Sequence, residues 1–172
     1  ADVAAFIGKA IADFGGLGLN LGVSYLHGGF TERFCINNAY NPAGNPACTA
    51  GNDLVPSGST LPFAPEWTAN AGVQYAFPLG GDLTFTPRAQ IGYTSDQISS
   101  PFPRAETRLD ERSIVDLRLT LDIGDRYTIE AYGTNVLDEV YIAAQVQNSS
   151  SSDGGIVYGA PVQYGVRGVA RF

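Results

Sequence analysis

Several stretches of the chain alternate apolar and polar side chains with a period of two, and this pattern constrains the fold most. In residues 162–172 one face carries no charge, while the other carries Arg167 and Arg171. The same period recurs in five further stretches, and more weakly in residues 2–13, whose facing the sequence does not fix. Successive side chains of a strand point to opposite faces, so this period predicts strands with one apolar side. The five stretches are residues 17–27, 67–77, 82–95, 112–122 and 126–135.

The connections between these stretches alternate between short and long. The short ones contain the Gly and Asp that tight hairpins require, and the long ones are polar. A meander with tight turns at one end and long loops at the other is the layout of outer-membrane β-barrels. In such a barrel the apolar row meets lipid and the polar row faces a watery or plugged interior. The short connections are residues 14–18, 78–82 and 122–126, and the long ones are residues 30–66, 96–110 and 144–157.

The charge content separates this interpretation from its soluble alternative. Charged residues make up 16% of the chain, against about 25% in soluble domains. A soluble antiparallel sandwich also alternates, but the low charge and the loop asymmetry favour a membrane sheet. No apolar run reaches the length of about 18 residues that a transmembrane helix needs. The net charge of −7 argues against a nucleic-acid partner, because phosphates require a basic surface.

The two cysteines, Cys35 and Cys48, lie within the first long loop. A metal site is disfavoured because the single histidine, His27, stands alone among the ligands that zinc prefers. We expect a disulfide, which would stabilise the fold by about 3 kcal/mol in the chain-entropy model. Disulfides persist in oxidising compartments, so this pair favours a location outside the cytosol.

Three segments resemble the closing strands of TonB-dependent receptors. In that family a Pro-Glu-Trp-like segment opens a strand after a long loop, an Asn-Leu-Phe-Asp-like segment with a following Tyr ends the penultimate strand, and a Gly-x-Pro segment begins the last strand. Asn135, Asp138 and Tyr141 fit the second pattern, and Gly159 and Pro161 fit the third. The three segments are LPFAPEWTANAGVQYAFPL (residues 61–79), IEAYGTNVLDEVY (residues 129–141) and GAPVQYGVRGVARF (residues 159–172).

The resemblance implies an all-β fold: an antiparallel up-and-down transmembrane β-barrel segment, with about seven strands of a larger barrel of the 22-strand type. Residues 1–172 would form the C-terminal portion of the receptor barrel, with neither the plug domain nor a TonB-contacting segment present. The implied function is active uptake of a scarce nutrient, siderophore-bound iron or another small ligand. The alternative is a small autonomous outer-membrane barrel with a structural or adhesion role, which would need an even number of strands, at least about eight.

The expected location is the outer membrane of a Gram-negative bacterium, with the long loops extracellular and the C-terminus periplasmic. The expected partners are the rest of the same barrel and its plug domain, TonB-ExbB-ExbD acting through that plug, the barrel-assembly machinery, outer-membrane lipid and lipopolysaccharide, and a small-molecule ligand. We expect no cofactor and no enzymatic activity. Ser24 and His27 are three residues apart, so in a strand their side chains would face opposite sides rather than form a catalytic pair.

Ligand contacts in this family come from the lumen wall and the outer loops, which gives a set of candidate residues. Aromatic side chains beside basic ones suit anionic or aromatic ligands, although they also suit loop packing and contacts with the plug. Phe172 resembles the terminal aromatic signal that barrel-assembly machinery recognises. The wall candidates are Arg88, Gln90, Arg118, Glu130, Tyr132 and Arg167, and the loop candidates are Tyr40, Phe102 and Arg104.

Overall fold

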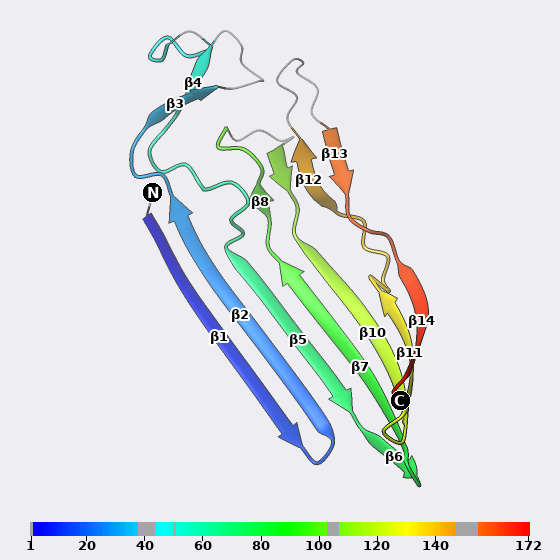
Figure 1. Ribbon diagram of the computed structural model, residues 1–172. Coiled ribbons are helices and arrows are strands. Elements are labelled where there is room, and N and C mark those ends of the chain that lie inside the picture. The colour runs from blue at the N-terminus through cyan, green and yellow to red at the C-terminus, as the bar shows by residue number, and fades with distance from the viewer. Residues whose placement is uncertain (1, 38–43, 50, 103–106, 147–154) are drawn as a thin grey trace.

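The computed structural model describes residues 2–37, 44–49, 51–102, 107–146 and 155–172, and it is built around a single curved antiparallel sheet (Figure 1). The main sheet has the strand order β1-β2-β5-β7-β10-β11-β14, with β6 paired to β7. This confirms the expected up-and-down meander of about seven strands. The strands are β1 (Asp2–Phe14), β2 (Leu17–Gly29), β5 (Trp67–Tyr75), β6 (Phe77–Gly80), β7 (Leu83–Thr94), β10 (Arg112–Ile123), β11 (Tyr127–Thr134) and β14 (Gln163–Ala170).

The strand that the sequence predicts over residues 67–77 is divided in the structure. β5 ends at Tyr75, and β6 begins at Phe77. Between them the backbone N–H of Ala76 donates to the carbonyl oxygen of Gly16 at 2.8 Å, and the pairing of β6 with β7 shifts register between Pro78 and Gly80. Proline has no N–H for the ladder, so an irregularity at this point is expected.

The three long connections contain short hairpins that the sequence does not predict. β3 (Phe34–Asn37) pairs with β4 (Asn52–Val55), and β8 (Gln97–Ile98) pairs with β9 (Arg108–Leu109). β12 (Ile142–Val146) pairs with β13 (Gly155–Tyr158). All three hairpins lie beyond the same end of the main sheet, opposite the tight turns (Figure 1). The connections of residues 30–66, 96–110 and 144–157 are therefore not wholly loops.

The main sheet is a single layer, and its apolar side chains are not buried in a protein core. Among the described residues the fully buried hydrophobic side chains are Val55 and Leu109, both in the outer hairpins. Leu83, Leu119 and Val166 on the main sheet are 37%, 48% and 77% exposed. A soluble sandwich would bury such residues between two sheets, so the structure excludes that alternative. The apolar face requires hydrocarbon as its solvent.

Aromatic side chains lie on the apolar face near both ends of the strands. Tyr25 and Trp67 are direct cross-strand partners near the long-loop end, with ring centroids 4.7 Å apart. Near the turn end the Tyr75 and Phe77 rings lie 4.4 Å apart. Tyr and Trp are enriched at both interfaces of a bilayer, where an apolar ring meets polar head groups. Within the described residues no helix is long and apolar enough to cross a membrane.

Strand pairing settles the facing of β1. Lys9 pairs with Gly22, and Ile11 pairs with Asn20, so both lie on the polar face. Ala10 and Ala12 consequently lie on the apolar face. The alternation is weak because the polar face of β1 also carries isoleucine. In the described sheet β1 and β14 each have one neighbour, so the sheet does not close on itself.

Candidate functional site

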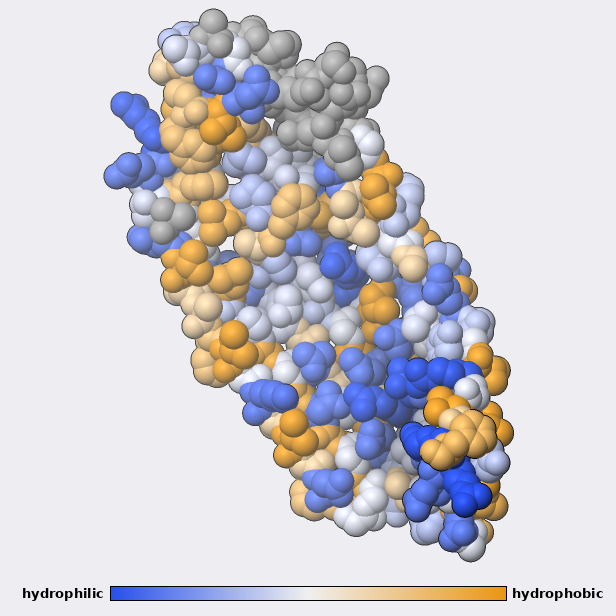
Figure 2. All heavy atoms as spheres, in the orientation of Figure 1, coloured by the Kyte–Doolittle hydropathy of each residue, from blue (hydrophilic) through white to orange (hydrophobic). Residues whose placement is uncertain are grey.

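The polar face of the main sheet is the candidate functional surface, and we call it the polar wall. The register places its side chains in rows that cross from one strand to the next. In Figure 2 hydrophilic side chains gather over the lower part of the sheet, on the face turned to the viewer. The polar wall includes Lys9, Asn20, Asn70, Gln74, Arg88, Gln90, Asp116, Arg118, Glu130, Tyr132, Gln163 and Arg167.

Arg88 lies at the centre of the polar wall and is held by neutral oxygens. Its Nη1 donates to Oε1 of Gln74 at 3.1 Å, and its Nη2 donates to Oε1 of Gln90 at 2.9 Å. Nη2 also lies 3.5 Å from Oδ1 of Asn20. Three strands therefore fix one guanidinium group. These contacts orient the side chain across the sheet, and among the described residues no carboxylate forms an ion pair with it.

Glu130 is held between two arginines on the adjoining strands. Its Oε1 lies 3.1 Å from Nη2 of Arg167, and its Oε2 lies 3.6 Å from Nε of Arg118. The Glu130 side chain is 8% exposed, whereas those of Arg118 and Arg167 are 54% and 62% exposed. The three residues occupy β10, β11 and β14, so the ion pairs link the last three strands of the sheet.

Removing the charge of Glu130 should have a moderate cost. Glu130→Gln leaves two guanidinium groups without their carboxylate, but both groups are more than half exposed and water screens them. We expect the free energy of unfolding to fall by about 1 to 2 kcal/mol. Urea unfolding in detergent micelles measures the change, with the exposed Glu32→Gln as a matched control. A loss no larger than that of the control would show that the two ion pairs contribute nothing.

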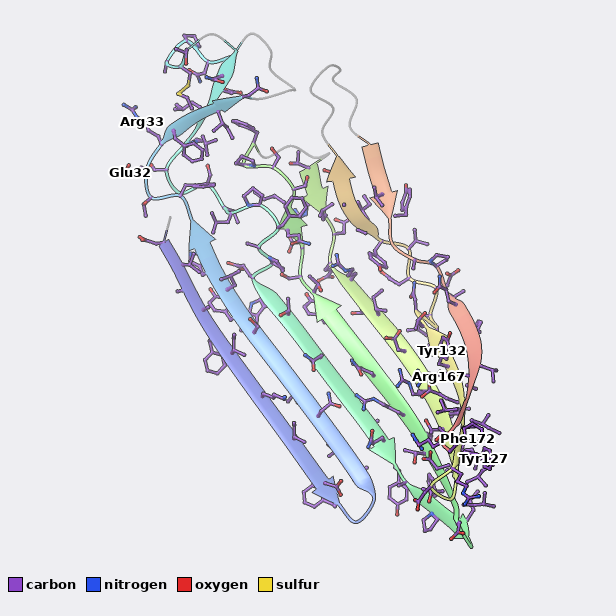
Figure 3. The ribbon with its side chains drawn as sticks, viewed as in Figure 1. Glu32, Arg33, Tyr127, Tyr132, Arg167 and Phe172 are labelled. Carbon is purple, nitrogen blue, oxygen red and sulfur yellow. A yellow bond between two sulfur atoms is a disulfide. The ribbon has the colours of Figure 1, made fainter. Side chains whose placement is uncertain are left out.

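Glycines on the polar wall allow long side chains to lie flat across the sheet. The Tyr132 ring covers Gly165, its cross-strand partner, so closely that a Cβ at this position would collide with the ring. Gly72 stands in the same relation to the Asn20 side chain. Figure 3 places Tyr132 and Arg167 near each other on β11 and β14. The wall therefore presents the sides of polar groups rather than their tips.

The outer end of the sheet holds a separate group of residues. A disulfide joins Cys35 and Cys48, and the rings of Phe30 and Phe34 meet at 4.8 Å. In the hairpin of β8 and β9, the N–H of Phe102 donates to Oγ of Ser100 at 3.2 Å. Figure 3 shows Glu32 and Arg33 at this end of the molecule, far from the labelled residues of the polar wall.

The disulfide gives a direct prediction. Alkylation of the denatured protein without reductant should add no label to Cys35 or Cys48, and reduction should lower the stability of the outer loop by about 3 kcal/mol. Intact mass measurement before and after reduction reads the first effect, and proteolysis of the segment around β3 and β4 reads the second. Two labelled thiols before reduction would contradict the bond.

The structure brings the six wall candidates together and places the loop candidate Phe102 apart from them. Arg88, Gln90, Arg118, Glu130, Tyr132 and Arg167 share the polar wall, whereas Phe102 is half-buried in an outer hairpin. Tyr40 and Arg104 lie outside the described residues. Sequence reasoning missed Asn20 and Gln74 as partners of Arg88. The alternation in the sequence places both residues on the polar side of their strands, but it does not give the register that aligns the three strands.

The described residues contain no arrangement that indicates metal or catalytic chemistry. No group of three or more His, Cys, Asp or Glu side chains lies together in them. His27 contacts Glu66, with Nδ1 and Oε1 3.1 Å apart, and Ser24 points to the opposite face of β2.

A single-layer sheet with an apolar outer face, aromatic belts and a polar inner wall defines a transmembrane β-barrel wall. A family model described as "TonB dependent receptor-like, beta-barrel" matches residues 4–136. The chain belongs to the TonB-dependent receptor family, in its barrel domain. Receptors of this family are outer-membrane proteins, and the family is one of transport receptors rather than enzymes.

Two solved structures share the fold. The ferric yersiniabactin uptake receptor FyuA from Yersinia pestis matches with a TM-score of 0.76 and 16% identity, over 99% of this chain and 23% of that one. The siderophore receptor PiuA from Acinetobacter baumannii matches with a TM-score of 0.71 and 14% identity, over 97% of this chain and 21% of that one. The chain therefore spans less than a quarter of the length of the receptors it resembles.

Proposed function

We propose that this chain forms the C-terminal part of the barrel of a TonB-dependent transporter that takes up a scarce nutrient, siderophore-bound iron or another small ligand. The observation that carries the proposal is the family match over residues 4–136. These residues include most of a sheet that is apolar on one face and polar on the other. FyuA is named as a ferric yersiniabactin uptake receptor and PiuA as a siderophore receptor, and both names support siderophore-bound iron as a possible cargo.

In this proposal the polar wall lines the lumen, where it meets a plug domain and the passing ligand. The outer hairpins are extracellular, and the tight turns and Phe172 are periplasmic. Figure 3 supports this polarity, because Tyr127 and Phe172 lie at the end opposite Glu32 and Arg33. Phe172 serves as the assembly signal for the barrel-assembly machinery. The remaining partners are the rest of the barrel, TonB-ExbB-ExbD, lipid and lipopolysaccharide.

The open edges of the described sheet favour this role over an autonomous adhesion barrel. β1 and β14 each leave one row of backbone hydrogen-bonding groups without a strand partner. In hydrocarbon such groups cost several kcal/mol each when unsatisfied, so we propose that strands from the rest of the same barrel pair with them.

An uptake experiment tests the function. The receptor that contains this chain is expressed in a Gram-negative host whose own siderophore receptors are deleted, and radioactive iron uptake is measured with a panel of ferric siderophores. We expect accumulation with at least one siderophore that disappears when the host tonB gene is deleted. Uptake that persists without TonB would contradict the proposed energy coupling. A correctly inserted receptor that takes up none of the panel would remove siderophore-bound iron as the cargo.

A further inference from the structure

The strand β13 has an open edge at the outer end of the molecule. Among the described residues β13 pairs with β12 alone, and the two strands form a sheet of their own. Each residue of a strand carries one N–H and one C=O, and in an antiparallel pair successive residues direct these groups to opposite sides. Every second residue of β13 therefore directs its backbone groups away from β12. Open edges of this kind are templates for pairing with another strand.

The side chains of β13 make this edge apolar on both faces. Ile156, Val157 and Tyr158 are 51%, 49% and 63% exposed. They are consecutive, so they point alternately to the two faces of the strand. Charged residues or proline commonly protect an edge strand that faces water, and β13 contains neither. The other two outer hairpins bury Val55 and Leu109 completely, so exposed apolar side chains are not a general property of this end.

The opposite side of the same hairpin is already in contact with its neighbour. Oγ of Ser99, in the connection between β8 and β9, donates to Oε1 of Gln145 on β12 at 2.5 Å. In Figure 1 β12 lies on the side of β8, and β13 lies on the far side of β12. The open edge of the hairpin is therefore the edge of β13.

This edge continues the open edge of β14. In Figure 1 β13 leads down into β14 along the border of the sheet. The residues between the two strands are held toward β11. The backbone N–H of Val162 donates to Oδ1 of Asp138 at 3.1 Å, and the carbonyl oxygen of Ala160 accepts Nδ2 of Asn135 at 3.2 Å. These side-chain bonds replace the strand ladder where it is interrupted, so β13 and β14 present their open edges on the same side.

We propose that β13 is a docking edge for a strand of the same receptor: the strand that pairs with β14 continues beyond the membrane and pairs with β13 as well. The proposal rests on the proposed function, in which the rest of the barrel completes the edge of β14. In a closed up-and-down barrel the neighbour of the last strand is the first strand. β14 runs toward the tight-turn end, so an antiparallel neighbour runs toward the outer end and arrives beside β13.

The chemistry of the edge identifies this occupant. Lipid hydrocarbon covers apolar side chains but offers no partner to backbone N–H and C=O groups. A strand supplies both, because its ladder bonds the backbone while its side chains pack on the two faces. A strand from a second receptor molecule would compete with the one that already lies in line with this edge. We therefore expect the docked segment to be apolar on both faces, unlike the strands within the membrane.

The docking has a consequence for the outer hairpins. β12 is bonded to the neighbouring hairpin through Ser99 and Gln145, and β13 would be bonded to the incoming strand. The last hairpin is then held from both sides. We expect it to remain in place during ligand capture rather than to move as a separate loop.

Hydrogen exchange tests the pairing in the receptor that contains this chain, purified in detergent and measured residue by residue. A strand paired on one side protects every second amide, whereas a strand paired on both sides protects consecutive amides. We expect the amides of Ile156, Val157 and Tyr158 all to exchange at least about a hundredfold more slowly than in an unstructured peptide. The proposal is overturned if every second amide of β13 exchanges at the rate of the unstructured peptide.

Photocrosslinking identifies the partner. Val157→p-benzoylphenylalanine should link to the first barrel strand of the same receptor molecule, or to the connection that follows it. The same probe in place of Arg33, at the other side of the outer end (Figure 3), should give no link to that segment. A Val157 probe that links only to a second receptor molecule, to lipopolysaccharide or to another segment, or that gives no link, overturns the proposal. Neither measurement depends on cargo or on TonB, so a receptor that takes up no siderophore can still show the docked edge, and the reverse.

Discussion

The Leu117→Arg substitution should lower the free energy of unfolding of the receptor in a lipid bilayer by about 2 to 4 kcal/mol, the cost of arginine on the lipid face of a barrel near the bilayer midplane. Leu117 is 44% exposed on the apolar face of β10. Its register partner Ala89 lies midway along β7, between Phe85 near the turn end and Tyr93 near the long-loop end. The register partners of Leu117 on the two neighbouring strands, Ala89 and Gly133, have no side-chain acceptor for a guanidinium group. Urea unfolding of the receptor in vesicles measures the effect.

The matched control places the same side chain on the other face of the same strand. Thr120 lies on the polar wall, paired with Thr86 on one side and with Glu130 on the other. Thr120→Arg therefore points toward polar neighbours and a carboxylate, and we expect a change below about 1 kcal/mol. An equal loss for the two variants would contradict the assignment of the two faces, whatever the size of the loss.

The strands were predictable because the bilayer imposes one rule over their whole length. Leu117, Leu119 and Leu121 must alternate with polar residues when one face meets hydrocarbon and the other meets water or protein. The side chains of the outer hairpins need not alternate in this way, because the hairpins lie beyond the end of the main sheet and its apolar face. The short strand Gln97–Ile98, for example, has no alternation to detect, and only its pairing with Arg108–Leu109 reveals it. Alternation therefore identifies strands that cross the membrane and is silent about strands that do not.

The polar wall was predictable as a set of residues but not as a network. Parity alone places Arg88, Arg118 and Glu130 on the polar sides of their strands. Which side chains meet depends on register, and register brings Asn20 to Arg88 from 68 residues away in the sequence. Without the register, the sequence does not show that Arg88 and Arg118 are cross-strand partners. A one-residue slip would turn each strand over, so the wall exists only in the register that the structure shows.

The segment at residues 129–141, which resembles a segment of TonB-dependent receptors, contains Asn135, and this residue organises the end of β11. Asn135 is 4% exposed and has a φ of 49°, in the left-handed region that Asn tolerates better than most residues. Its Nδ2 donates to the carbonyl oxygens of Glu139 at 2.9 Å and Ala160 at 3.2 Å, and its Oδ1 accepts the N–H of Glu139 at 2.9 Å. One side chain therefore connects the end of β11 to the approach to β14.

The Asn135→Ala substitution should lower the free energy of unfolding by about 3 to 4 kcal/mol, from three lost hydrogen bonds at about 1 kcal/mol each and the left-handed backbone. Asn135→Gly loses the same bonds without the backbone cost, so it should be about 1 kcal/mol less destabilising than Asn135→Ala. Urea unfolding in micelles compares both with Gln163→Ala, an exposed position on β14. If Asn135→Ala lowers the free energy of unfolding no more than Gln163→Ala does, the hydrogen bonds of Asn135 do not stabilise the connection between β11 and β14. If the alanine and glycine variants are equal, the hydrogen bonds alone determine the loss, and the left-handed backbone of Asn135 carries no measurable strain.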